Sequence, residues 1–257
     1  MNGPGQHANN RNTWPFPVLM AMMVVGGLAA LAAAAQPGTA ILAVSTAGAF
    51  VFNGLIRALP FGATITERAL IRAAYWLPLV IPVLCLPGLR AGLTSGLPDL
   101  PALALGGLVG AALSFVFLWP SRQLFLDRDL REIVVPRQSA ANLALSVQSM
   151  AGAAVFEELF FRYAVFALIP DIGTALFLSV VLFVLSHYSL PWASRDFRPR
   201  DYANQMLAGV ALGLLYLVTG SLGACILAHI TFNIARLGPL ILRNLASSRS
   251  PHELHDT

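Results

Sequence analysis

Two adjacent glutamates and an arginine lie in an otherwise apolar stretch near the middle of the chain, in the run FEELFFR at residues 156–162. Inside a bilayer one charged residue at a helix centre costs roughly 2.5 to 3.5 kcal/mol on insertion scales. Three such charges are tolerated only where they face the protein interior, pair with one another or contact trapped water. The run therefore predicts a functional site within a membrane, built on Glu157, Glu158 and Arg162.

The spacing of these charged residues predicts different roles for them. Glu158 and Arg162 are four residues apart on a helix, so they can form an ion pair, and such a pair could simply fix helix packing. Glu157 points about 100° away from Glu158. Because a second carboxylate leaves net negative charge in low-dielectric surroundings, Glu157 is the better candidate for a proton acceptor.

Two later apolar stretches each carry a polar motif with the same spacing. His187 follows Phe183 by four residues, and Asn233 follows His229 by four residues. Taken alone, each motif is explained equally well by polar contacts between helices. Together with Glu157 they supply a base, two imidazoles and an amide, which are sufficient to add water to a carbonyl group.

Composition predicts the elements that must position these side chains. The chain has 257 residues, of which 57% are hydrophobic and 11% charged, far from the usage of a soluble domain. We expect an all-α, polytopic transmembrane helix bundle of about eight helices. Apolar runs of suitable length predict spans at Val18–Ala35, Gly38–Ile56, Ala73–Leu89, Ala102–Trp119, Ala140–Ile169, Ile172–Leu190, Ala203–Thr219 and Leu222–Leu242.

Loop charge predicts the orientation of the bundle. All 16 basic residues are arginine. Those outside the predicted spans gather before the first span and after every even-numbered one, whereas the opposite loops hold only Arg90. Cytoplasmic loops are enriched in basic residues, so both termini are expected in the cytoplasm. Because the arginines form no single basic stripe, a nucleic-acid partner is not expected. Cys85 and Cys225 lie far apart in apolar segments and predict neither a disulfide nor a metal site.

These patterns divide the chain into four parts. Residues 1–17 form a predicted cytoplasmic tail, 18–139 a four-helix membrane region, 140–246 the region that carries the polar motifs, and 247–257 a disordered cytoplasmic tail. The first span resembles a secretory signal. We expect it to be retained, because the next apolar segment follows after a Pro-Gly turn and would form a hairpin with it.

The three motifs together resemble those of the CPBP family of intramembrane endopeptidases, which includes the type II CAAX prenyl endopeptidases and bacterial Abi-type relatives. The resemblance covers roughly Ala140 to Leu242, with the motifs in the family's order and each on its own predicted helix. One departure is Tyr163, where relatives often have glycine. Residues 1–139 carry nothing that matches.

The resemblance implies a glutamic-type peptidase, hence a hydrolase, that requires no cofactor. In it Glu157 and His187 would activate a water, while His229 and Asn233 would stabilise the oxyanion. Glu158, Arg162 and Phe183 would support them. The implied substrate is a membrane-anchored or membrane-proximal protein or peptide, cleaved at the lipid bilayer by a multi-pass protein of a bacterial inner (plasma) membrane.

Two alternatives remain open on the residues alone. Glu157, His187 and His229 could instead hold zinc with an open position for water, although the chain has no HExxH helix. The protein could also be a transporter or a non-catalytic scaffold with a buried proton relay, although no inverted repeat or broken paired helix is evident.

The depth of the residues in the membrane constrains the shared site. A span that began at Ala140 would put Glu157 more than about 20 Å below the cytoplasmic face, whereas His187 would lie near that face. We therefore expect residues 139–149 to be interfacial or cytoplasmic, with the span beginning near Met150. The last helix must then be short, tilted or recessed. A separation of more than about 12 Å between Glu157, His187 and Asn233 would contradict one shared site.

Overall fold

The computed structural model describes residues 37–58, 64–94, 99–187 and 199–248, and these residues form helices and no strands. The all-α prediction is confirmed. Three of the described helices are long and apolar enough to cross a membrane, or four if one bent pair forms a single span. The first predicted span, at Val18–Ala35, and both predicted tails apart from residues 247–248 lie outside the described residues.

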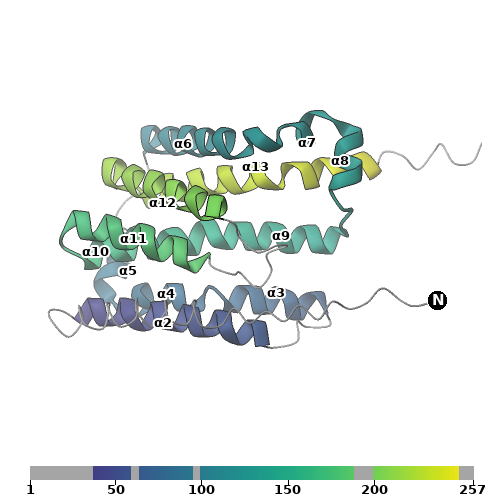
Figure 1. Cartoon of the computed structure of the whole chain (residues 1–257). Coiled ribbons are helices and arrows are strands. Elements are labelled where there is room, and N and C mark those ends of the chain that lie inside the picture. The colour runs from purple at the N-terminus through teal and green to yellow at the C-terminus, as the bar shows by residue number, and fades with distance from the viewer. Residues whose placement is uncertain (1–36, 59–63, 95–98, 188–198, 249–257) are drawn as a thin grey trace, which may run out of the picture.

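The described helices are arranged in three groups (Figure 1). The N-terminal group lies along one side of the bundle and contains α2 (Pro37–Ala58), α3 (Ile65–Ala74), α4 (Leu77–Cys85) and α5 (Pro87–Thr94). The central group contains α9 (Ala140–Gly152), η2 (Ala153–Glu157), η3 (Leu159–Ala164), α10 (Val165–Leu168) and α11 (Ile172–Ser186). The third group contains α6 (Leu100–Leu118), α7 (Gln123–Leu126), α8 (Arg128–Val134), α12 (Pro199–Thr219) and α13 (Leu222–Ser248). The chain therefore places the segments that carry Glu157, Glu158, Arg162 and His187 between the other two groups.

The span predicted at Ala73–Leu89 is not one continuous helix in the structure. The chain breaks at Tyr75 and Trp76, where α3 and α4 meet at 43°, and it breaks again at Leu86. Pro78 and Pro82 lie in α4. A proline has no N–H to continue a helical hydrogen-bond ladder and clashes with the preceding turn, so an uninterrupted helix through this segment is disfavoured.

Helix α11 is shorter than the span predicted for it. Its 15 residues correspond to roughly 22 Å, less than the hydrocarbon thickness of about 30 Å. The described part of this segment ends at His187, directly after the last residue of α11. His187 therefore lies at the end of a helix that is too short to cross the bilayer by itself.

Helices α6 and α13 pack with their backbones almost in contact. A Cβ atom added at Gly106 would lie 2.4 Å from the carbonyl oxygen of Ala224, and one added at Gly110 would lie 2.4 Å from that of Ala228. This small-residue contact is the GxxxG arrangement by which membrane helices approach closely. It holds the part of α13 that precedes His229.

We expect Gly110→Ala to destabilise the protein by about 1 to 3 kcal/mol, because the added methyl group would overlap a backbone atom that cannot rotate away. Gly107→Ala is the matched control, since a Cβ atom there meets nothing within 4 Å. The measurement is the denaturation midpoint of each variant in detergent. Equal midpoints for the two variants would show that the α6–α13 contact has room to relax.

Candidate active site

The charged run does not lie on a regular α-helix. Residues 153–157 and 159–164 form two π-helical segments on either side of Glu158, continuous with α9 and α10. The sequence had predicted ordinary α-helical spacing here. Single π-turns are rare and are often found at functional sites. The wider turn nevertheless keeps the predicted pairing, since Arg162 Nε lies 3.2 Å from Glu158 Oε2.

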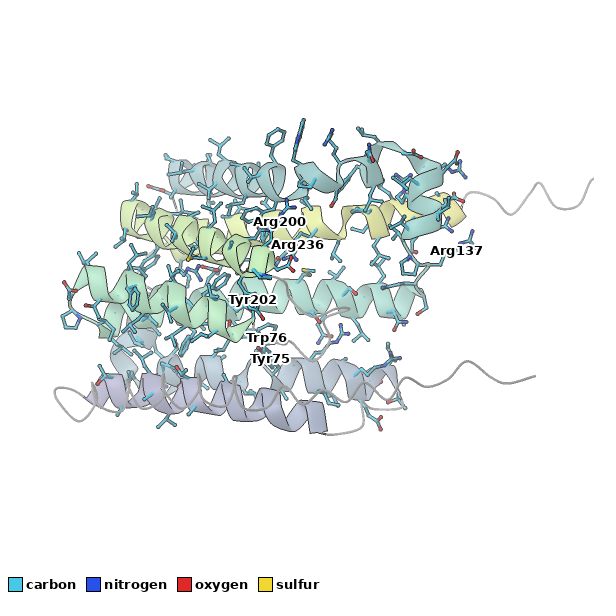
Figure 2. The ribbon with its side chains drawn as sticks, in the orientation of Figure 1. Tyr75, Trp76, Arg137, Arg200, Tyr202 and Arg236 are labelled. Carbon is cyan, nitrogen blue, oxygen red and sulfur yellow. The ribbon has the colours of Figure 1, made fainter. Side chains whose placement is uncertain are left out.

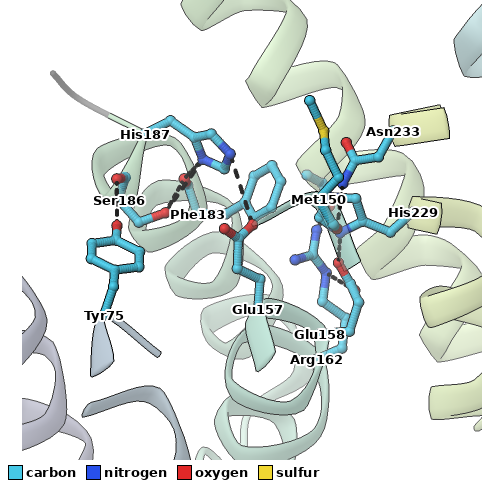
Figure 3. A network of polar contacts seen from close by, with 11 residues as sticks. Tyr75, Met150, Glu157, Glu158, Arg162, Phe183, Ser186, His187, His229 and Asn233 are labelled. Carbon is cyan, nitrogen blue, oxygen red and sulfur yellow. Dashed lines mark hydrogen bonds and ion pairs between the residues drawn. The ribbon is translucent and has the colours of Figure 1, made fainter. Parts of the chain in front are cut away.

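Glu158 also binds a residue that the sequence did not assign to it. Its Oε1 atom lies 2.7 Å from His229 Nδ1 on α13, as Figure 3 shows. Arg162 donates from NH2 to the carbonyl oxygen of Gly209 on α12, at 3.3 Å. Glu158 and Arg162 have no solvent exposure and His229 only 3%. This buried network therefore joins three helical segments that are far apart in the sequence.

Phe183 contributes through its ring and its backbone. The Arg162 guanidinium lies 4.5 Å from the centre of the Phe183 ring, a distance at which a cation is attracted to the aromatic face. The Phe183 carbonyl oxygen lies 2.7 Å from His187 Nδ1. Phe183 is thus in contact with the arginine network on one side and with the imidazole of His187 on the other.

The Phe183 carbonyl fixes the tautomer of His187. A carbonyl oxygen can only accept, so Nδ1 must carry the proton, and in the neutral ring Nε2 is then an acceptor. His187 Nε2 lies 3.8 Å from Glu157 Oε2, which is too far for a direct hydrogen bond. Glu157 is 5% exposed, and its Oε2 atom has no hydrogen-bond partner within the described parts of the chain. Two buried acceptors therefore face each other.

Asn233 lies on the opposite side of the motif segment. Its Nδ2 atom donates to the carbonyl oxygen of Met150, at 3.1 Å, and so links α13 to the end of α9. An amide NH₂ group has two donors, so one N–H remains for another acceptor. Glu157, His187, His229 and Asn233 appear in one polar cluster in Figure 3, together with Met150.

The charges of the cluster do not balance. Glu157 and Glu158 supply two carboxylates, whereas Arg162 supplies one guanidinium, and all three side chains are buried. A buried excess charge is costly. One further proton, on Glu157 or on His229, would make the cluster neutral, so this arrangement favours chemistry in which a proton moves.

The zinc alternative requires Glu157, His187 and His229 to converge on one ion. Glu157 and His187 do lie close together, but His229 directs Nδ1 to Glu158. In the described residues no three His, Cys, Asp or Glu side chains are grouped as metal ligands. In this arrangement His229 Nδ1 is engaged by Glu158 rather than by Glu157 or His187.

Sequence reasoning missed several residues that hold the site. Gly106 and Gly110 could have been identified by their four-residue spacing in an apolar helix. Tyr75 and Trp76 give a weaker signal, since they are aromatic residues shortly before a proline. Met150 gives none, because it contributes only a backbone carbonyl.

Residues 139–235 match the model of a protein family described as type II CAAX prenyl endopeptidase, Rce1-like. The matched stretch begins at the cap of α9 and includes all the residues predicted for the site. No curated protein and no solved structure matches the chain.

Proposed function

We propose that this membrane protein is an intramembrane glutamic peptidase, because residues 139–235 match the model of the Rce1-like type II CAAX prenyl endopeptidase family. It hydrolyses a peptide bond in a membrane-anchored or membrane-proximal protein. The observation that carries the proposal is the pair of buried acceptors, Glu157 Oε2 and His187 Nε2, which face each other 3.8 Å apart. A water molecule bound to both atoms would donate one hydrogen to each.

The first step is attack by this water on the substrate carbonyl carbon. The water oxygen forms a bond to carbon as a proton passes to Glu157, and the carbonyl oxygen becomes an oxyanion. Collapse of the tetrahedral intermediate breaks the C–N bond. The proton held by Glu157 then moves to the departing nitrogen, which restores the base. The products are a carboxylic acid chain and an amine chain, and the acid then loses its proton to the amine or to water.

The developing oxyanion needs hydrogen-bond donors. Asn233 can supply the N–H that is not bound to Met150. His229 can donate from Nε2 when it is an imidazolium, and Glu158, at 2.7 Å from Nδ1, holds the ring in place. Arg162 holds Glu158 in place. These roles support the assignment of Glu157, His187, His229 and Asn233 as catalytic residues, with Glu158, Arg162 and Phe183 as their supports.

The proposal also states in which membrane the protein lies and how it is oriented. The protein is a multi-pass protein of the cell's inner (plasma) membrane, with both termini in the cytoplasm. Loop charge supports this orientation, because Arg122, Arg128 and Arg137 are exposed in the segment that joins α6 to α9. The substrate reaches the site from the lipid bilayer, and no metal takes part in the reaction.

The test is cleavage of a library of lipid-anchored peptides by the full chain in proteoliposomes, with products identified by mass spectrometry. We expect hydrolysis to continue at an unchanged rate after treatment with EDTA and 1,10-phenanthroline. Asn233→Ala should lower kcat about 10²- to 10³-fold, the range for loss of one oxyanion donor. Loss of activity on chelation, restored by zinc alone, would replace this mechanism with a metallopeptidase.

A further inference from the structure

Hydrogen bonds to the carbonyl groups at the C-terminal end of α11 fix the position of His187. The last four carbonyl groups of a helix have no partner within the helix and must be satisfied from elsewhere. At this end the Phe183 carbonyl binds His187 Nδ1 at 2.7 Å and Ser186 Oγ at 2.8 Å. The hydroxyl group of Tyr75 donates to the Ser186 carbonyl at a longer 3.4 Å. Tyr75 thus anchors this helix end from a distant part of the sequence.

Tyr75 lies at the break between α3 and α4, and the next residue contacts the other half of the site. Trp76 stacks on Phe156, with ring centres 6.3 Å apart and planes inclined by 21°. It also covers Gly152, where an added Cβ atom would lie 2.5 Å from Trp76 Nε1. Phe156 directly precedes Glu157, so Trp76 packs against the π-helical segment that carries the proposed base.

The rings of Tyr75 and Trp76 pack against each other. Their centres are 4.7 Å apart in an edge-to-face arrangement at 81°, and each side chain is 5% exposed. Figure 2 shows Tyr75 and Trp76 side by side, between the N-terminal helices and the central group. A displacement of one ring would therefore displace the other.

We propose that Tyr75 and Trp76 are positioning residues that set the distance between His187 and Glu157. Tyr75 holds the end of α11, and Trp76 holds the start of the π-helical segment. The 43° bend between α3 and α4 allows two consecutive residues to reach both halves of the pair. The N-terminal helices, which carry no recognisable motif, thereby become part of the catalytic apparatus. This inference rests on the proposed roles of Glu157 and His187.

The hydroxyl group of Tyr75 acts by its hydrogen bond rather than by close packing. Tyr75, Ser186, Thr46, Phe160 and Phe161 line a cavity of about 20 Å³, which is room for one water molecule. Packing between Tyr75 and the end of α11 is therefore incomplete, and close packing alone does not hold this helix end. When the hydroxyl group is lost, the Ser186 carbonyl loses the side-chain donor that the described structure gives it.

The test compares Tyr75→Phe with the wild type. The variant keeps the buried ring and removes only the hydroxyl group. We expect kcat to fall about 3- to 10-fold, the equivalent of one hydrogen bond, with KM unchanged because no substrate contact is lost. In ¹⁵N-histidine spectra of the detergent-solubilised chain, His187 should change from one Nδ1–H tautomer to a mixture. Assignment of its signals uses His187→Gln.

Tyr163→Phe is the matched control. The Tyr163 hydroxyl group also donates to a backbone carbonyl, that of Leu89, but it contacts neither α11 nor Trp76 in the described structure. We expect wild-type kcat and a single His187 tautomer in this variant. An equal fall in kcat in both variants would overturn the inference. It would mean that the Tyr75 bond contributes to stability in the same way as the Tyr163 bond and has no specific effect on His187.

Trp76→Phe tests the other half of the proposal. The smaller ring should leave the His187 tautomer unchanged and lower kcat, because it loosens the segment of Glu157 and not the end of α11. Wild-type kcat in both Tyr75→Phe and Trp76→Phe would refute the positioning roles. Failure of the proposed function gives a different result, namely activity that survives in Glu157→Gln, and the tautomer spectra of Tyr75→Phe can be read without any activity.

Discussion

Replacing Glu157 with Gln is expected to lower kcat by about 10²- to 10⁴-fold, the usual contribution of a general base. Glutamine keeps the size of the side chain but cannot accept the proton of the attacking water. The rate is measured in proteoliposomes with the peptide that the library identifies. Hydrolysis by Glu157→Gln at the wild-type rate would contradict the proposed mechanism.

The same substitution should leave the protein as stable as the wild type or more stable. Glu157 Oε2 is buried without a hydrogen-bond partner in the described structure, and Glu157 lies beside a second carboxylate. Removal of that charge relieves repulsion and desolvation. Catalytic sites commonly combine poor stability with function in this way. The denaturation midpoint in detergent measures the effect.

Glu132→Gln is the matched control for this change. Glu132 lies on α8, where it pairs with Arg128 and Arg243 at 3.1 and 3.2 Å and its side chain is 35% exposed. The same loss of a carboxylate at this exposed position should leave kcat unchanged. A fall in kcat equal to that of Glu157→Gln would show that any loss of a carboxylate disturbs the enzyme.

Glu158→Gln should have the largest effect on stability, a loss of about 3 to 5 kcal/mol. Glu158 forms an ion pair with Arg162 and a hydrogen bond with His229 Nδ1, and all three side chains are buried. Removal of the Glu158 charge breaks a fully buried ion pair and leaves the guanidinium without its direct partner. The free energy of unfolding can be measured by titration with a denaturing detergent.

The double variant Glu158→Gln/Arg162→Met separates charge from packing. Methionine removes the guanidinium left without its direct partner, so much of the lost stability should return, while activity should not, because His229 still lacks the carboxylate that holds its ring in place. The two residues are in contact, so non-additive effects are expected. A double variant as unstable as the sum of the two single variants would show that the ion pair is not the source of the loss.

The local sequence was sufficient to predict the composition of the site. Glu157, His187, His229 and Asn233 stand out because charged and polar side chains are expensive in apolar helices, and the i, i+4 spacing of Glu158 and Arg162 is enough to predict their contact. The all-helical fold follows for a related reason, since every backbone N–H and C=O in a bilayer must be satisfied within its own segment or in a closed barrel.

The local sequence could not predict which residues on other helices these side chains contact. The bond from Glu158 to His229 spans 71 residues, and that from Asn233 to Met150 spans 83. A glutamate or an asparagine can bond to many polar groups. The packing of α13 therefore decides which partner each of them meets. The π-helical turns on either side of Glu158 were likewise not predicted, since the spacing of the charged run is compatible with an ordinary α-helix. Spacing within one helix is a local property of the backbone, whereas the approach of two helices depends on every residue between them. The close contact of Gly110 with Ala228 is therefore part of the reason that His229 reaches Glu158.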